Sequence, residues 1–92
     1  MIIRISGEDQ YRLSDADGER LNGLETAVSA AVESHDEHAF AEAYRVLLDH
    51  VRTSGERVGD DEIENSDVIL PPADTTLAEA AGEFTGEGLI PD

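Results

Sequence analysis

The sequence predicts a single small α+β domain, and three patterns support this fold class. Apolar and polar residues alternate over residues 1–13, two helical patterns occupy residues 14–55, and a β-branched run stopped by two prolines follows an acidic stretch. A length of 92 residues suits one domain over residues 1–92, with a small core.

A β-hairpin is predicted over residues 1–13. Period-two alternation runs on both sides of Gly7-Glu8-Asp9, where glycine can adopt the positive φ of a tight turn. One face of this hairpin would present Ile3, Ile5, Tyr11 and Leu13. Because an isolated hairpin is only marginally stable, that face must pack on another element.

A helical hairpin is predicted over residues 14–55. Ser14 with Asp17 three residues later is typical of a helix start. The apolar stripe of the first helix follows at helical spacing: Leu21, Leu24, Val28, Ala31 and Val32. We expect Glu25 and Ser29 on its opposite, polar side.

The second helix begins at a cap formed either by Ser34 or by Asp36 and ends at Gly55. Its apolar stripe consists of Phe40, Ala43, Tyr44, Leu47, Leu48 and Val51. Glu42–Arg45 and Asp49–Arg52 are i,i+3 ion pairs. The short break between the two helices predicts that they are antiparallel neighbours.

The last third of the chain is predicted as an acidic connector over residues 56–67 and an extended segment, short helix and apolar tail over residues 68–92. The connector is expected to be a solvated loop. Val68-Ile69-Leu70 favours a strand that ends at Pro71-Pro72, and one or both extended pieces could join the sheet. Thr76 with Glu79 is a capping-box pair that opens the short helix.

The composition excludes several classes of function. The formal charge is −16, from 22 acidic residues and six arginines, with no lysine and no cysteine. Such a charge repels nucleic acid and anionic lipid, and the absence of cysteine excludes disulfides and thiolate sites. We expect no membrane insertion, no signal peptide and a cytoplasmic location.

Three explanations of the acidity remain open. The first is adaptation to high salt, where a Debye length of about 3 Å at 1 M removes self-repulsion. The second is a docking surface for a basic partner, and the third is mimicry of nucleic acid.

No catalytic, cofactor or metal site is predicted. His35 and His38 are expected to lie exposed without a dedicated site, and His50 is expected to complement the C-terminal end of the second helix. A calcium loop starting at Asp60 would need glycine and glutamate at its sixth and twelfth positions, where Asn65 and Pro71 stand. We therefore predict a protein that is not an enzyme. A small enzyme or ligand-binding domain using acidic residues, or a self-associating module, is the alternative.

Binding features are what remain. Apolar surface on the helical hairpin either covers the sheet or receives another helix. The candidate partner-binding residues are Leu70, Pro71, Pro72, Leu89 and Ile90. The last two could instead fold back onto the core, because their burial is worth roughly 25 cal/mol per Å².

Several stretches together resemble the PspAA family of PspA-associated proteins. They are Met1-Ile2-Ile3-Arg4-Ile5-Ser6-Gly7 followed by Gln10-Tyr11-Arg12-Leu13, the helical pair of about forty residues, the stretch from Ser66 through Pro71-Pro72 to Glu79, and Glu87-Gly88-Leu89-Ile90-Pro91. The order and spacing of these stretches carry the resemblance over nearly the whole chain.

The resemblance implies a companion of PspA, a coiled-coil envelope-stress protein that coats and repairs membranes. It therefore implies a partner and not a reaction, and it carries over no catalytic residue. The expected role is an adaptor or regulator, cytoplasmic or peripheral to the membrane through that partner. The extreme acidity without lysine suggests a haloarchaeal member, and a homo-oligomer is compatible with it.

Overall fold

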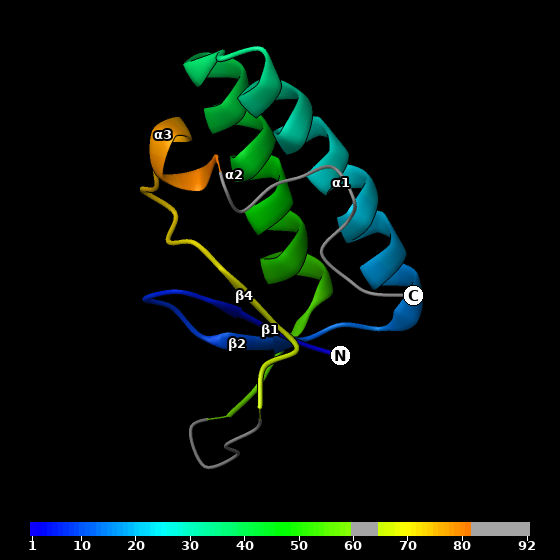
Figure 1. Cartoon of the computed structure of the whole chain (residues 1–92). Coiled ribbons are helices and arrows are strands. Elements are labelled where there is room, and N and C mark those ends of the chain that lie inside the picture. The colour runs from blue at the N-terminus through cyan, green and yellow to red at the C-terminus, as the bar shows by residue number, and fades with distance from the viewer. Residues whose placement is uncertain (60–64, 82–92) are drawn as a thin grey trace.

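The structure is a computed structural model and describes residues 1–59 and 65–81. Two long helices stand above a sheet of short strands, and a one-turn helix lies beside the second of them (Figure 1). The elements in chain order are β1 (Ile2–Ile5), β2 (Gln10–Arg12), α1 (Asp15–Glu33), α2 (Glu37–Ser54), β3 (Glu56–Arg57), β4 (Val68–Leu70) and α3 (Leu77–Ala80). The predicted α+β fold class is confirmed.

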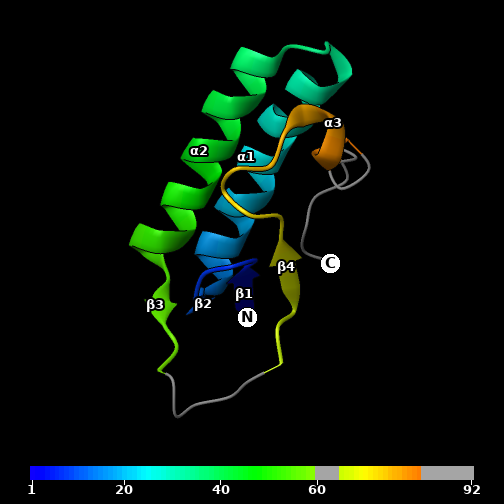
Figure 2. The ribbon, with the colours of Figure 1, turned by 90° about the vertical axis from the view of Figure 1, so that its left-hand side faces the viewer.

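The sheet has the strand order β3-β2-β1-β4, and Figure 2 shows the four strands side by side below the helices. β1 pairs with β2 in antiparallel fashion, with Ile3 opposite Tyr11, as the predicted hairpin requires. On its other side β1 pairs in parallel with β4, where Ile3 is opposite Val68. The segment predicted as extended therefore does join the sheet.

Hydrogen bonds from residues just before β4 extend the parallel pairing of β1 with β4. The Ile2 N–H donates to Asp67 Oδ2 at 2.7 Å, and the Asp67 N–H donates to the Ile2 carbonyl at 2.8 Å. Gln10 Nε2 donates to Ser66 Oγ at 2.8 Å. These bonds join residues more than fifty positions apart, and so they fix where β4 lies.

The prediction of a solvated loop over residues 56–67 is wrong at both ends. Residues 56 and 57 form β3, which pairs with β2, and the buried Val58 donates its N–H to the Gln10 carbonyl at 2.9 Å. Asp67 and Ser66 anchor the far end, as described above. The acidic composition hid this pairing because strand edges accept charged residues readily. Residues 60–64 lie outside the described part of the chain.

The two helices begin where their caps predict. Ser14 Oγ accepts the Asp17 N–H at 3.2 Å, and Asp36 Oδ1 accepts the Ala39 N–H at 3.0 Å. Asp36, and not Ser34, is thus the cap of α2. The capping box of Thr76 with Glu79 opens α3 as predicted.

The turn between the helices contains a left-handed residue that the sequence does not predict. His35 has a φ of 55°, in the left-handed region that favours glycine. Its N–H donates to the Val32 carbonyl and the Asp36 N–H donates to the Ala31 carbonyl, both at 3.1 Å. This pair of bonds is the Schellman pattern, so one short turn ends α1 and starts α2.

The core lies between the sheet and the helical hairpin. Its buried members are Ile3, Ile5, Leu13, Leu21, Val28, Ala31, Phe40, Tyr44, Leu47, Leu48, Val51, Leu70, Leu77 and Ala80. Most of the predicted stripes are here, while Tyr11, Leu24, Val32 and Ala43 are partly buried against the core. Within the described part of the chain, no helix is long and apolar enough to cross a membrane.

One helix face was predicted wrongly. Glu25 and Ser29 were expected on the solvent side of α1, but they are 1% and 4% exposed. Both take part in a polar or electrostatic interaction. Burial of a carboxylate is tolerated when it is partnered, so helical spacing alone could not place these residues.

Gly55 ends α2 at the predicted position but for a different reason. Its φ is −79°, which any residue can adopt. A Cβ at this position would lie 2.5 Å from the Val51 carbonyl oxygen and 2.8 Å from Tyr11 Cβ. The close approach of α2 to β2, and not a left-handed turn, requires glycine here.

We expect Gly55→Ala to lower the free energy of unfolding by about 1–3 kcal/mol, because the added methyl overpacks a close contact. Gly59→Ala is the matched control, since a Cβ there would meet nothing within 4 Å. Chemical denaturation of both variants measures the difference. Equal stabilities of the two variants would contradict the steric explanation.

Candidate functional site

The first candidate surface surrounds the exposed edge of β4 and the two prolines after it. We call it the β4 face; a shallow hollow of about 320 Å³ marks it, lined by Ser6, Ile69, Leu70, Pro71, Pro72, Thr75 and Glu79. Alternation along the strand decides which side chains are available. Leu70 is 1% exposed in the core, whereas Ile69 is 64% exposed.

The segment after β4 is held against α2. The Tyr44 hydroxyl donates to the Pro71 carbonyl, and the Tyr44 ring stacks on Phe40 with centroids 5.7 Å apart. The Thr75 N–H donates to the Pro72 carbonyl at 3.0 Å, which forms a turn before α3. Proline rings and these bonds make the β4 face a rigid surface, so binding there would order little extra chain.

The predicted partner-binding residues separate in the structure. Leu70 is a core residue, Pro71 is half-buried and Pro72 is exposed. Leu89 and Ile90 lie outside the described residues. Ile69 was not among the predicted residues, although it is the exposed apolar residue of this strand. The alternation of Val68-Ile69-Leu70 was the signal for its exposure, because a buried Leu70 turns its neighbour outward.

The second candidate surface is the helical groove, an apolar depression of about 430 Å³ between α1 and α2. It is lined by Leu24, Ala27, Ala39, Glu42, Ala43 and Val46. Val46 is 43% exposed and, with Ile69, is one of two large exposed hydrophobic residues in the described part of the chain. The helical hairpin therefore both covers the sheet and leaves an apolar surface open, which combines the two alternatives from the sequence.

The histidines provide little chemistry. His35 and His38 are exposed, as expected, and in residues 1–59 and 65–81 no group of three His, Asp or Glu side chains is placed to hold a metal. His50 lies near the C-terminal end of α2, as the sequence predicts. It is buried, with Nε2 3.0 Å from the Asp17 carbonyl oxygen and Nδ1 3.1 Å from Ser54 Oγ. It therefore joins the end of α2 to the start of α1.

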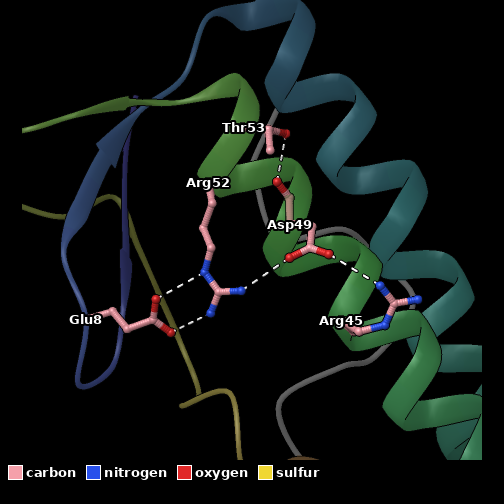
Figure 3. A network of polar contacts seen from close by, with 5 residues as sticks. All are labelled: Glu8, Arg45, Asp49, Arg52 and Thr53. Atoms are coloured by element: carbon pink, nitrogen blue, oxygen red, sulfur yellow. Dashed lines mark hydrogen bonds and ion pairs between the residues drawn. The ribbon is translucent and has the colours of Figure 1, made fainter.

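An ion-pair network joins the hairpin turn to α2 (Figure 3). Arg52 binds Glu8 with two parallel bonds, Nε–Oε1 at 3.1 Å and Nη2–Oε2 at 2.6 Å, and also reaches Asp49 at 3.3 Å. Asp49 contacts Arg45 at 3.4 Å, and Arg45 pairs with Glu42 at 3.0 Å. Both predicted i,i+3 pairs are confirmed, but the long-range bond to Glu8 was not foreseen.

The network shifts the pKa of Glu42, Arg45 and Arg52 in the directions expected for ion pairs. The hydrogen bond to Arg45 and its charge lower the pKa of Glu42. The hydrogen bond to Glu8 raises the pKa of Arg52, and burial, which lowers it, has a smaller effect. Glu42, Arg45 and Arg52 are therefore held in their charged forms and act as structural partners.

A comparison with protein-family models gives a match. The model of the PspAA family, described as PspA-Associated protein, matches residues 1–92. No curated protein and no solved structure matches the chain.

We expect Glu8 and Arg52 to show a coupling energy of about 0.5–1 kcal/mol in a double-mutant cycle with Glu8→Gln and Arg52→Gln, because the geometry is bidentate but partly exposed. Denaturation at low salt and in about 1 M KCl should show the coupling shrink with screening. The more exposed Asp9–Arg57 pair is the control and should couple more weakly. Equal coupling in the two pairs would refute the special role of Arg52.

We expect Arg45→Gln to raise the pKa of Glu42 toward its ordinary value. A lowered pKa means that the pair stabilises the fold above the ordinary pKa of the carboxyl group, and that this contribution disappears as the pH falls through the lowered value. Carboxyl-carbon NMR titration measures the midpoint, with Arg57→Gln as the control that leaves it in place. A Glu42 midpoint unaffected by Arg45→Gln would contradict the assignment.

Proposed function

This chain belongs to the PspAA family of PspA-associated proteins, and on that premise we propose that it is a non-enzymatic adaptor that binds a PspA-like coiled-coil protein in the envelope stress response. The family match over residues 1–92 is the observation that carries the proposal. It places the chain among proteins described by their association with another protein. Regulation of PspA, at the membrane surface that PspA covers, is the role that such an adaptor would serve.

The β4 face is the contact that we propose for this partner. Ile69 offers a solvent-exposed apolar side chain on a strand whose next residue, Leu70, is anchored in the core. The hollow beside it is bounded by Pro71 and Pro72, and has room for an apolar side chain of a partner helix. An apolar anchor with a polar rim is typical of protein interfaces.

The charged residues around the β4 face favour a partner helix with complementary charges. Glu79 lies on its rim, and Arg4 is the register neighbour of Ile69 on β1, where the two side chains share one face of the sheet. A helix that places a basic residue toward Glu79 and an acidic residue toward Arg4 would fit best. In a chain of net charge −16, such local pairing requires salt to screen the remaining repulsion.

We expect the chain and a PspA-like protein to co-purify as a stoichiometric complex at about 1 M KCl, where long-range repulsion is screened. Ile69→Asp should weaken binding at least about tenfold, because it places a charge in an apolar contact. Titration calorimetry or light scattering measures both effects. Val46→Asp, in the helical groove, is the matched control and should bind like the unaltered chain.

Two results would count against this function in different ways. Separate elution of the chain and the PspA-like protein at both low and molar salt would reject the adaptor proposal. A stable complex that Ile69→Asp does not weaken would reject the β4 face as its contact.

A further inference from the structure

We propose that the helical groove is an interface between two copies of this chain, related by a two-fold axis that runs parallel to α1 and α2. The proposal concerns a surface separate from the β4 face and does not depend on the proposed function. In this dimer the two helical hairpins pack face to face as four helices, with both sheets at the same end of the helices.

The groove residues are not among the fully buried core residues, although Leu24, Ala39 and Ala43 pack against the core with part of their surface. On α2 the buried positions are Phe40, Tyr44, Leu47, Leu48 and Val51, whereas the groove takes Ala39, Glu42, Ala43 and Val46 from another side of the same helix. Val46 is 43% exposed, and its side chain borders a depression lined mainly by apolar residues. An open apolar helix face of this kind is typical of a helix-packing interface.

Gly23 is the second observation. It lies in the interior of α1, where glycine costs about 1 kcal/mol relative to alanine. A Cβ at this position would meet nothing within 4 Å, so no contact within the described chain requires glycine here. Gly23 is one turn before Ala27 on the groove side of α1. A missing side chain there lets another helix approach closely.

The positions of these residues along the helix axes allow the groove of one copy to pack against the same groove of a second copy. His50 Nε2 lies 3.0 Å from the Asp17 carbonyl oxygen, which sets the two helices level at that point. Four residues back along α2 is Val46, and four residues forward along antiparallel α1 is Leu21, which is about 3 Å in height from Gly23 at 1.5 Å per residue. A two-fold axis parallel to the helices places α1 of one copy opposite α2 of the other at equal height. Val46 of each copy then lies within about one helical turn in height of Gly23 of the other.

The charges at the rims also complement each other in this arrangement. Arg20 lies on α1, one turn from Leu24, and is exposed, while Glu42 lines the groove on α2 and Asp49 is seven residues further along the same side of that helix, where it pairs with Arg45 and Arg52. The same axis brings Arg20 of each copy toward Asp49 of the other. Glu42 keeps its partner Arg45 within its own chain, so the interface does not leave that carboxylate unpaired.

The available area suffices for a specific dimer. Helices of 18–19 residues are about 28 Å long and about 10 Å wide each, so two copies could cover about 1,100 Å² in total. This just exceeds the roughly 1,000 Å² that a specific interface needs. Because each copy carries a charge of −16, the dimer should form only where salt screens the repulsion.

The test is the mass of the full chain by light scattering and sedimentation equilibrium at low salt and in about 1 M KCl, with the chain mass of 9.9 kDa as the monomer reference. We expect a two-copy mass in molar salt. Val46→Asp should raise the dimer dissociation constant at least about 100-fold, because each dimer would bury two charges. Ile69→Asp is the matched control and should leave the dimer intact.

Gly23→Leu separates loss of the interface from loss of the fold. Leucine has a higher helix propensity than glycine, and a Cβ at this position meets nothing within 4 Å, so the variant should unfold at a higher temperature as a monomer while it fails to dimerise. A monomeric mass of the unaltered chain at every salt concentration would overturn the proposal. So would a dimer that tolerates both groove variants, or one that Ile69→Asp dissociates.

Discussion

The fold depends on the double pairing of β1. Ile3 and Ile5 are fully buried on this strand, and each contributes about 1.5–3 kcal/mol by leaving water. Their strand can be buried in this way only because β2 pairs along one side and β4 along the other. Without β4, one backbone edge of β1 would lose its partner, and the cost of an unpaired buried amide is of the same order as the gain.

The position of β4 in turn creates the β4 face. A parallel strand added beside β1 has no strand beyond it in the described sheet, and its alternation sends Leu70 inward and Ile69 outward. The Tyr44 hydroxyl then holds the chain at Pro71 against α2, which positions the surface after the strand. The strand β4 therefore both stabilises the fold and carries the proposed partner contact.

Salt acts on this molecule in two opposite ways. The bond between Arg52 and Glu8 ties the hairpin turn to α2, and screening weakens it. Screening also removes the repulsion of a chain with a net charge of −16, which stabilises the compact state and permits association. Apolar contacts at Ile69 and Val46 keep their strength in molar salt, so both proposed interfaces rely on them.

Local signals in the sequence determined the α+β class, the hairpin, the helix caps at Ser14 and Thr76, and the family. Caps and alternation involve residues a few positions apart, so the sequence alone is enough to predict them. Tertiary structure alone decided the burial of Glu25, the pairing of β3 and β4 with the hairpin, and the bond from Glu8 to Arg52. These three features depend on contacts between residues tens of positions apart in the sequence. Whether a charged side chain is exposed or buried is decided by the element that packs beside it.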